Sequence, residues 1–75
     1  MKSPSKKLPV LSWREVIKAL QKAGFTIAHQ KGSHIILSKH GKFIAVPKHE
    51  EIAKGTLMSI IRDAGLTKEE FLKLI

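Results

Sequence analysis

A chain of 75 residues has room for one small domain, in which about 60% of the unfolded surface becomes buried. Its composition, 43% apolar and 27% charged, is that of a folded domain, and the lack of cysteine excludes disulfides and thiolate zinc sites. No apolar run approaches the ~20 residues of a membrane span, and the basic start lacks the apolar stretch of a signal peptide. We therefore expect a cytoplasmic protein without membrane contact.

The charge is unevenly distributed along the chain. The net charge is +8; residues 1–49 carry ten bases and one acid, or +9, whereas residues 50–75 carry four bases and five acids, or −1. One basic face directed at a polyanion would explain this asymmetry, and closely spaced phosphates reward clustered cations by releasing counterions. Nucleic acid is the expected partner, although a charge excess that only improves solubility is the alternative.

The first expected element is a helix over residues 12–23, which follows a basic N-terminal arm at 1–7. Ser12 and Glu15 have the spacing of a capping box. Gly24 supplies the left-handed residue that commonly ends a helix. The intervening apolar residues recur at helical spacing, and we assign residues 8–75 to a single domain.

Three short strands are expected next. The segments Phe25–Gln30, Ser33–Lys39 and Lys42–Pro47 are rich in β-branched and apolar residues, with turn signals at Lys31-Gly32 and His40-Gly41. Two successive hairpins predict a three-stranded antiparallel meander. Strict alternation in the first strand places Phe25 and Ile27 on one face and Thr26, Ala28 and Gln30 on the other.

Two further helices complete the expected fold. Apolar spacing from Leu57 to Ala64 predicts a helix that starts near residues 53–55 and ends at Gly65. Thr67 and Glu70 form a second capping box that begins a short last helix. The order α-β-β-β-α with a short extra C-terminal helix predicts an α+β two-layer sandwich, topologically like a double-stranded-RNA-binding domain.

The four histidines, at 29, 34, 40 and 49, do not have the spacing of a common metal site, and no carboxylate lies between Lys31 and His49. We therefore expect no metal and no other cofactor. RNA carries its own nucleophile, because the 2′-hydroxyl can attack the neighbouring phosphorus. Such a reaction needs a group that moves protons and a cation that stabilises the developing charge. Histidine, with an unperturbed pKa of about 6.5, and lysine suit these tasks.

His34 is the best-placed histidine for this chemistry. It follows Lys31-Gly32-Ser33, and strand alternation puts it on the face opposite Ile35 and Leu37. If that apolar pair faces the helices, His34 points outward. His49 is a second candidate, whereas His29 and His40 are unremarkable. Exposed strand and loop histidines without a catalytic role are common, so the residues alone leave both interpretations open.

Several short motifs in this chain resemble those of the HicA-like (YcfA-type) toxins of type II toxin–antitoxin systems. A lone Gly-Ser-His is weakly informative, but the whole set in this order is specific, and the resemblance covers about residues 8–75. The motifs are Leu8-Pro9-Val10-Leu11-Ser12, Ala23-Gly24-Phe25, Lys31-Gly32-Ser33-His34, Val46-Pro47-Lys48-His49, Lys54-Gly55-Thr56-Leu57 and Ala64-Gly65-Leu66-Thr67.

The resemblance implies a small ribonuclease that cuts messenger RNA without a metal, on the fold of a double-stranded-RNA-binding domain. It implies that the histidine of Gly-Ser-His, His34, is the catalytic residue. It also implies a HicB-type antitoxin that binds the toxin and covers this site. The last helix is expected to be structural.

The leading hypothesis is therefore an endoribonuclease in which His34 transfers a proton. One histidine does not obviously serve as both base and acid, so His49, a lysine or water would supply the other transfer. The residues expected to bind RNA or phosphate are Lys31, Gly32, Ser33, Lys39, Lys48 and Lys54.

Three other functions are to be set beside this hypothesis. A non-catalytic RNA-binding module is the main alternative, but such domains place several lysines at the start of their last long helix, where this chain offers Lys54 and Arg62. A protein whose basic face docks an acidic antitoxin is compatible with the ribonuclease. Direct DNA binding is the least favoured, because the long helices are separated by strands and no helix-turn-helix spacing appears.

Overall fold

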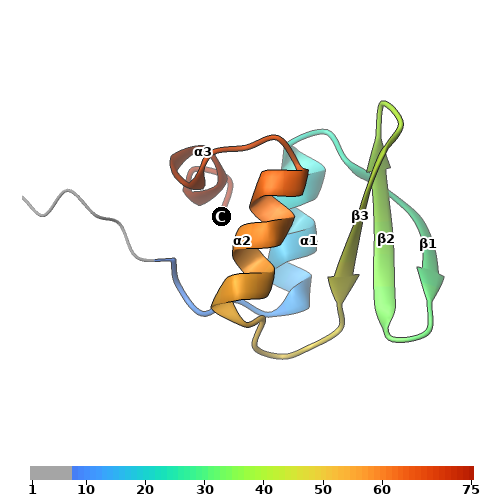
Figure 1. Ribbon diagram of the computed structural model, residues 1–75, viewed down its shortest axis with the longest axis horizontal. Helices are drawn as coiled ribbons and strands as arrows, with labels where there is room; N and C mark the ends of the chain where they lie inside the picture. The colour runs from blue at the N-terminus through green and yellow to red at the C-terminus, as the bar shows by residue number, and fades with distance from the viewer. Residues whose placement is uncertain (1–7) are drawn as a thin grey trace, which may run out of the picture.

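The computed structural model describes residues 8–75, so the predicted arm at 1–7 lies outside the described residues. Three helices lie beside a three-stranded sheet, and β1 is the strand farthest from them (Figure 1). The elements in chain order are α1 (Trp13–Lys22), β1 (Thr26–Lys31), β2 (His34–Lys39), β3 (Lys42–Pro47), α2 (Lys54–Asp63) and α3 (Lys68–Leu72). This arrangement confirms the predicted α+β fold with its extra C-terminal helix.

Local hydrogen bonds explain where α1 begins and ends. The Ser12 hydroxyl accepts from the Glu15 amide, and the Glu15 carboxylate accepts from the Ser12 amide, which completes the predicted capping box. At the other end Gly24 has φ +102°, and the Phe25 amide donates to the Leu20 carbonyl at 3.0 Å. These are the bonds of a Schellman motif, which turns the chain from α1 into β1.

The ends of α2 and α3 are fixed in part by the same hydrogen-bond motifs. Ala53 precedes α2 and provides no side-chain cap, which explains why the sequence leaves the start of this helix vague. Gly65, at φ +76°, ends α2 in a second Schellman motif. The Thr67–Glu70 capping box then begins α3 with bonds of 2.8 and 3.0 Å.

The sheet is an antiparallel meander in the order β1-β2-β3. The His40-Gly41 turn is confirmed, with positive φ at both residues, as a two-residue type I′ hairpin requires. The first turn consists of Gly32 and Ser33, one residue later than predicted. Lys31 belongs to β1 because it pairs with His34, and the left-handed φ of +59° falls on Gly32.

The hydrophobic core lies between the helices and one face of β2 and β3. Ile35 and Leu37 of β2 and Ile44 and Val46 of β3 are buried there against the apolar faces of α1 and α2. Every residue of β1 is exposed. In the described part of the chain, no helix covers the second face of the sheet, which we call the open face. Among residues 8–75, no helix is long and apolar enough to span a membrane.

Candidate functional site

His34 is the first residue of the central strand, β2, and its side chain lies on the open face. Its neighbour Ile35 is 6% exposed and faces the helices, whereas His34 itself is exposed. The register pairs His34 with Lys31 on β1 and with Pro47 on β3. Cross-strand partners share a face, so the Lys31 side chain lies beside that of His34. The predicted outward position of His34 is confirmed.

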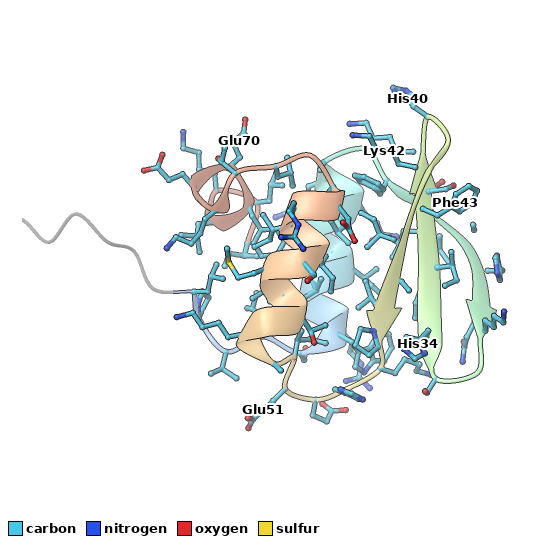
Figure 2. The ribbon with its side chains drawn as sticks, viewed as in Figure 1. His34, His40, Lys42, Phe43, Glu51 and Glu70 are labelled. Atoms are coloured by element: carbon cyan, nitrogen blue, oxygen red, sulfur yellow. The ribbon has the colours of Figure 1, made fainter. Side chains whose placement is uncertain are left out.

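The Gly32-Ser33 turn brings polar backbone to the same end of the sheet. A Cβ atom added to Gly32 would meet nothing within 4 Å, so this turn is open to a ligand. The Ser33 carbonyl accepts the Lys48 amide at 2.8 Å, which ties the turn to the segment after β3. The structure therefore brings Lys31, Gly32, Ser33 and Lys48 to the end of the sheet where His34 lies. Figure 2 shows the position of His34 at this end.

The loop from Lys48 to Ala53 is held against the start of α1. The Trp13 amide donates to the His49 carbonyl at 3.0 Å, and the Ile52 amide donates to the Leu11 carbonyl at 2.8 Å. The Lys48 ammonium lies 5.1 Å from the centre of the Trp13 ring, within cation–π range. Two backbone bonds and one aromatic contact thus position Lys48 near the His34 end of the sheet.

His49 is exposed and lies beyond the last residue of β3. Its amide donates to the Pro47 carbonyl at 2.8 Å, within the loop, and it has no partner in the sheet register. Lys54 begins α2, in the helix layer, after the same loop. Both residues therefore lie outside the strand pairing that positions His34.

Lys39 is separated from His34 by the length of β2, about 17 Å at 3.4 Å per residue. Its ammonium donates to the Ala23 carbonyl at 2.7 Å and lies 5.7 Å from the centre of the Phe25 ring, on the helix side of the sheet. The ammonium of its cross-strand partner Lys42 lies close to Gly65, the residue that ends α2. Both lysines thus lie at the C-terminal ends of helices, where cations are favourable. The structure separates Lys39 from the site where the sequence suggested it would hold phosphate.

A bulge in β1 changes the faces that strict alternation predicts. The register passes from Ile27 opposite Leu37 to His29 opposite Ile36, which leaves Ala28 without a partner. As a result Gln30, opposite the buried Ile35, lies on the helix side rather than with Thr26, so the predicted alternation is wrong beyond Ala28. The same shift turns His29 onto the open face, which the sequence analysis did not foresee.

The open face also carries an exposed aromatic ring. Phe43 of β3 pairs with Ser38 and is 65% exposed, at the end of the sheet opposite His34 (Figure 2). The three strands contain Lys31, Lys39 and Lys42 but no Asp or Glu. Within the sheet, the charged neighbours of His34 are therefore cations, and the nearest acids in the chain, Glu50 and Glu51, lie in the loop after β3.

Within residues 8–75, no three His, Cys, Asp or Glu side chains lie close enough together to hold a metal ion. A hollow of about 240 Å³ lies between α1 and the C-terminus, away from the sheet. It is lined by Glu15, Lys18, Ala19, Lys22, Leu74 and Ile75.

Comparison with known protein families identifies a family that covers most of the chain. A family model described as the HicA toxin of bacterial toxin–antitoxin systems matches residues 13–66, from the start of α1 to the residue after the glycine that ends α2. The matched region includes every element except α3. No curated protein matches the chain.

Proposed function

Because the chain belongs to the HicA toxin family of bacterial toxin–antitoxin systems, we propose that it is a metal-independent endoribonuclease that cleaves messenger RNA in the cytoplasm. As a toxin of such a system it has an antitoxin partner, and we propose that this partner is of the HicB type. The observation that carries the proposal is the position of His34, exposed on a sheet face without acids and directly opposite Lys31.

The proposed reaction is an attack of the ribose 2′-hydroxyl on the adjacent phosphorus. It leaves a 2′,3′-cyclic phosphate on one fragment and a 5′-hydroxyl on the other, and it needs no metal-bound water because the nucleophile belongs to the RNA. His34 moves a proton, as an imidazole can near neutral pH. Lys31 and Lys48 stabilise the negative charge that grows on the phosphoryl oxygens. The exposed Gly32-Ser33 turn lets the RNA backbone approach closely.

The test compares wild type with His34→Ala on RNA in the presence of EDTA. We expect wild type to cleave and His34→Ala to lose at least about a hundredfold in rate, the typical contribution of a proton-transfer residue. His40→Asn is the matched control, because His40 lies in the turn at the far end of β2 and should leave cleavage unchanged. Equal cleavage by wild type and His34→Ala would remove His34 from the mechanism.

A second experiment addresses the biological role. Induced expression of wild type should arrest growth, whereas His34→Ala should not, because arrest depends on RNA cleavage. Co-expression of an acidic protein from the same operon should relieve the arrest, since an inhibitor that covers a basic site is expected to be acidic. Growth arrest by His34→Ala equal to that of wild type would instead point to toxicity through binding alone.

A further inference from the structure

We infer that His29 is the second proton-transfer residue of the reaction and works with His34 across the β1–β2 ladder. The inference rests on the proposed function, since it names a further catalytic residue for that cleavage. A displacement at phosphorus takes one proton from the 2′-hydroxyl and gives one to the departing 5′-oxygen, so two groups are better suited to it than one. The structure offers a second imidazole on the same face.

The bulge at Ala28 is the observation that places His29. Ile27 lies opposite Leu37, which is fully buried, and so belongs to the helix side. Without the bulge His29 would share that side, two residues further along the strand. The register instead pairs His29 with Ile36, on the open face with His34.

His29 and His34 are diagonal neighbours in the ladder. His29 pairs with Ile36 and His34 pairs with Lys31, so each histidine lies one cross-strand step and two residues from the other. Diagonal neighbours on one face lie about 7–8 Å apart, with their Cβ atoms somewhat closer, within reach of ring side chains. Two imidazoles at that separation can approach one phosphoryl group from opposite sides, each within hydrogen-bond distance of a different oxygen.

The surroundings of His29 suit the same chemistry. His29 is exposed, and the strands contain no carboxylate to compete with a phosphate. Lys31 follows His29 by two residues on the same face and lies opposite His34, so the one cation borders both histidines. A phosphate held by Lys31 would have an imidazole on either side.

His29 fits this role better than His49, the second histidine that the sequence suggested. The His49 backbone is occupied within the loop after β3, by Pro47 on one side and by Trp13 on the other. Its position follows Pro47, the last residue paired with β2, so the sheet does not fix its side relative to His34. Strand pairing therefore fixes the face on which His29 lies, whereas the position of His49 depends on the loop after β3.

Together, His29 and His34 account for both proton transfers of the reaction. One imidazole, neutral, takes the proton of the 2′-hydroxyl as the bond from that oxygen to phosphorus forms. The other, protonated, gives its proton to the 5′-oxygen as the phosphorus–oxygen bond breaks. The net result is a cyclic phosphate, a 5′-hydroxyl and one proton moved between the two histidines, which solvent then returns.

The experiment uses an RNA oligonucleotide that spans a cleavage site mapped with wild type, and a second oligonucleotide with sulfur in place of the departing 5′-oxygen. A thiolate leaves without a proton, so the sulfur substrate removes the need for the acid alone. We expect His29→Ala and His34→Ala each to lose about a hundredfold or more on the oxygen substrate. On the sulfur substrate one of these two variants should recover to near the wild-type rate, which identifies it as the acid, while the other stays defective.

Controls separate this inference from the proposed function. His40→Asn should behave as wild type on both substrates, and circular dichroism checks that the exposed His29→Ala variant is folded. If His34→Ala is defective but His29→Ala cleaves as wild type does, or if His49→Ala is the variant that sulfur rescues, the inference is wrong and the ribonuclease stands. If neither His29→Ala nor His34→Ala recovers, His29 acts in RNA binding and the inference is also wrong. Wild type that leaves RNA intact overturns the proposed function itself.

Discussion

At the level of single residues, Lys31 and Lys39 show how strand position decides what a cation contacts. Both occupy the last position of their strands. Lys31 lies on the open face opposite His34, whereas the Lys39 ammonium donates to the Ala23 carbonyl beyond the end of α1. One is free to meet a ligand, and the other satisfies a backbone oxygen that the helix leaves without an intrahelical partner.

Replacing these two lysines with uncharged residues should therefore affect different properties, namely RNA cleavage for Lys31 and stability for Lys39. Lys31→Ala should slow RNA cleavage about tenfold or more and change stability little, because it removes charge beside the reacting phosphate. Lys39→Met should lower the free energy of unfolding by about 1 kcal/mol, through the lost bond to Ala23, and leave cleavage near wild type. Cleavage rates and urea denaturation measure the two effects. A large loss of activity in Lys39→Met at temperatures where it is folded would contradict this division.

At the level of elements, the start of α1 connects the helix layer to the site. The capping box at Ser12 fixes the first turn, and the next amide, that of Trp13, holds the His49 carbonyl. The Trp13 ring in turn contacts the Lys48 ammonium. The cap therefore helps to position the loop that carries Lys48.

Ser12→Ala should lower the free energy of unfolding by about 1 kcal/mol, as loss of an N-cap typically does. It should also speed hydrogen exchange at the Trp13 and Ile52 amides, whose acceptors lie across the junction between α1 and the loop. Thr67→Ala is the matched variant, because it removes the same kind of cap from α3. Faster exchange at Trp13 in Thr67→Ala but not in Ser12→Ala would show that the cap and the loop are not coupled.

The β2–β3 turn offers a stabilising change. His40 has φ +49°, a left-handed conformation that costs a residue with a side chain about 1 kcal/mol, and Asn tolerates it better. His40→Asn creates the Asn-Gly pair that type I′ turns favour. It should raise the free energy of unfolding by about 0.5–1 kcal/mol in urea denaturation. Unchanged or lower stability would mean that His40 makes a compensating contact.

The helices and the place of His34 were predictable because their signals are local. Capping boxes and the glycines after α1 and α2 lie within a few residues of the ends they fix, and the alternation of Ile35 and Leu37 around Ile36 is enough to turn His34 outward. The partners of Lys39 and Lys42 depend on how the helices pack against the sheet, which no short segment encodes. The bulge at Ala28 depends on the pairing of β1 with β2, and Thr26–Gln30 carries no glycine or proline to mark it.

At the level of the whole molecule, the charge asymmetry of the sequence is only partly reflected in a separation of charge between the sheet and the helices. Lys31 and Lys48 lie at the His34 end of the sheet, but Lys39 and Lys42 face the helices, and Lys18 and Lys22 lie on α1. The basic residues that the structure describes thus lie on several sides of the molecule, with Lys31 and Lys48 beside the site. Long-range attraction and local phosphate contact are therefore distinct contributions to RNA binding.

RNA binding by the inactive His34→Ala variant should therefore fall with salt. Two phosphate contacts to a single strand predict a slope of about −1.4 in log affinity against log salt, or about a sevenfold loss between 50 and 200 mM. Adding Lys31→Ala should reduce the slope by about 0.7, whereas adding Lys18→Ala, on α1, should leave it nearly unchanged. Equal effects of the two lysines would indicate that RNA is held by overall charge alone.

The unpaired residue in β1 bears on whether a second extended chain can pair with this strand. β1 is an outer strand, exposed along its whole length, and a regular strand in that position would present an unbroken row of amides and carbonyls to any second extended chain. Ala28 interrupts that row and bends the strand. Deleting Ala28 would make Ile27 and the following imidazole adjacent, so that imidazole would stay opposite Ile36 on the open face. The deletion would, however, leave a straighter margin on which strands of neighbouring molecules could assemble.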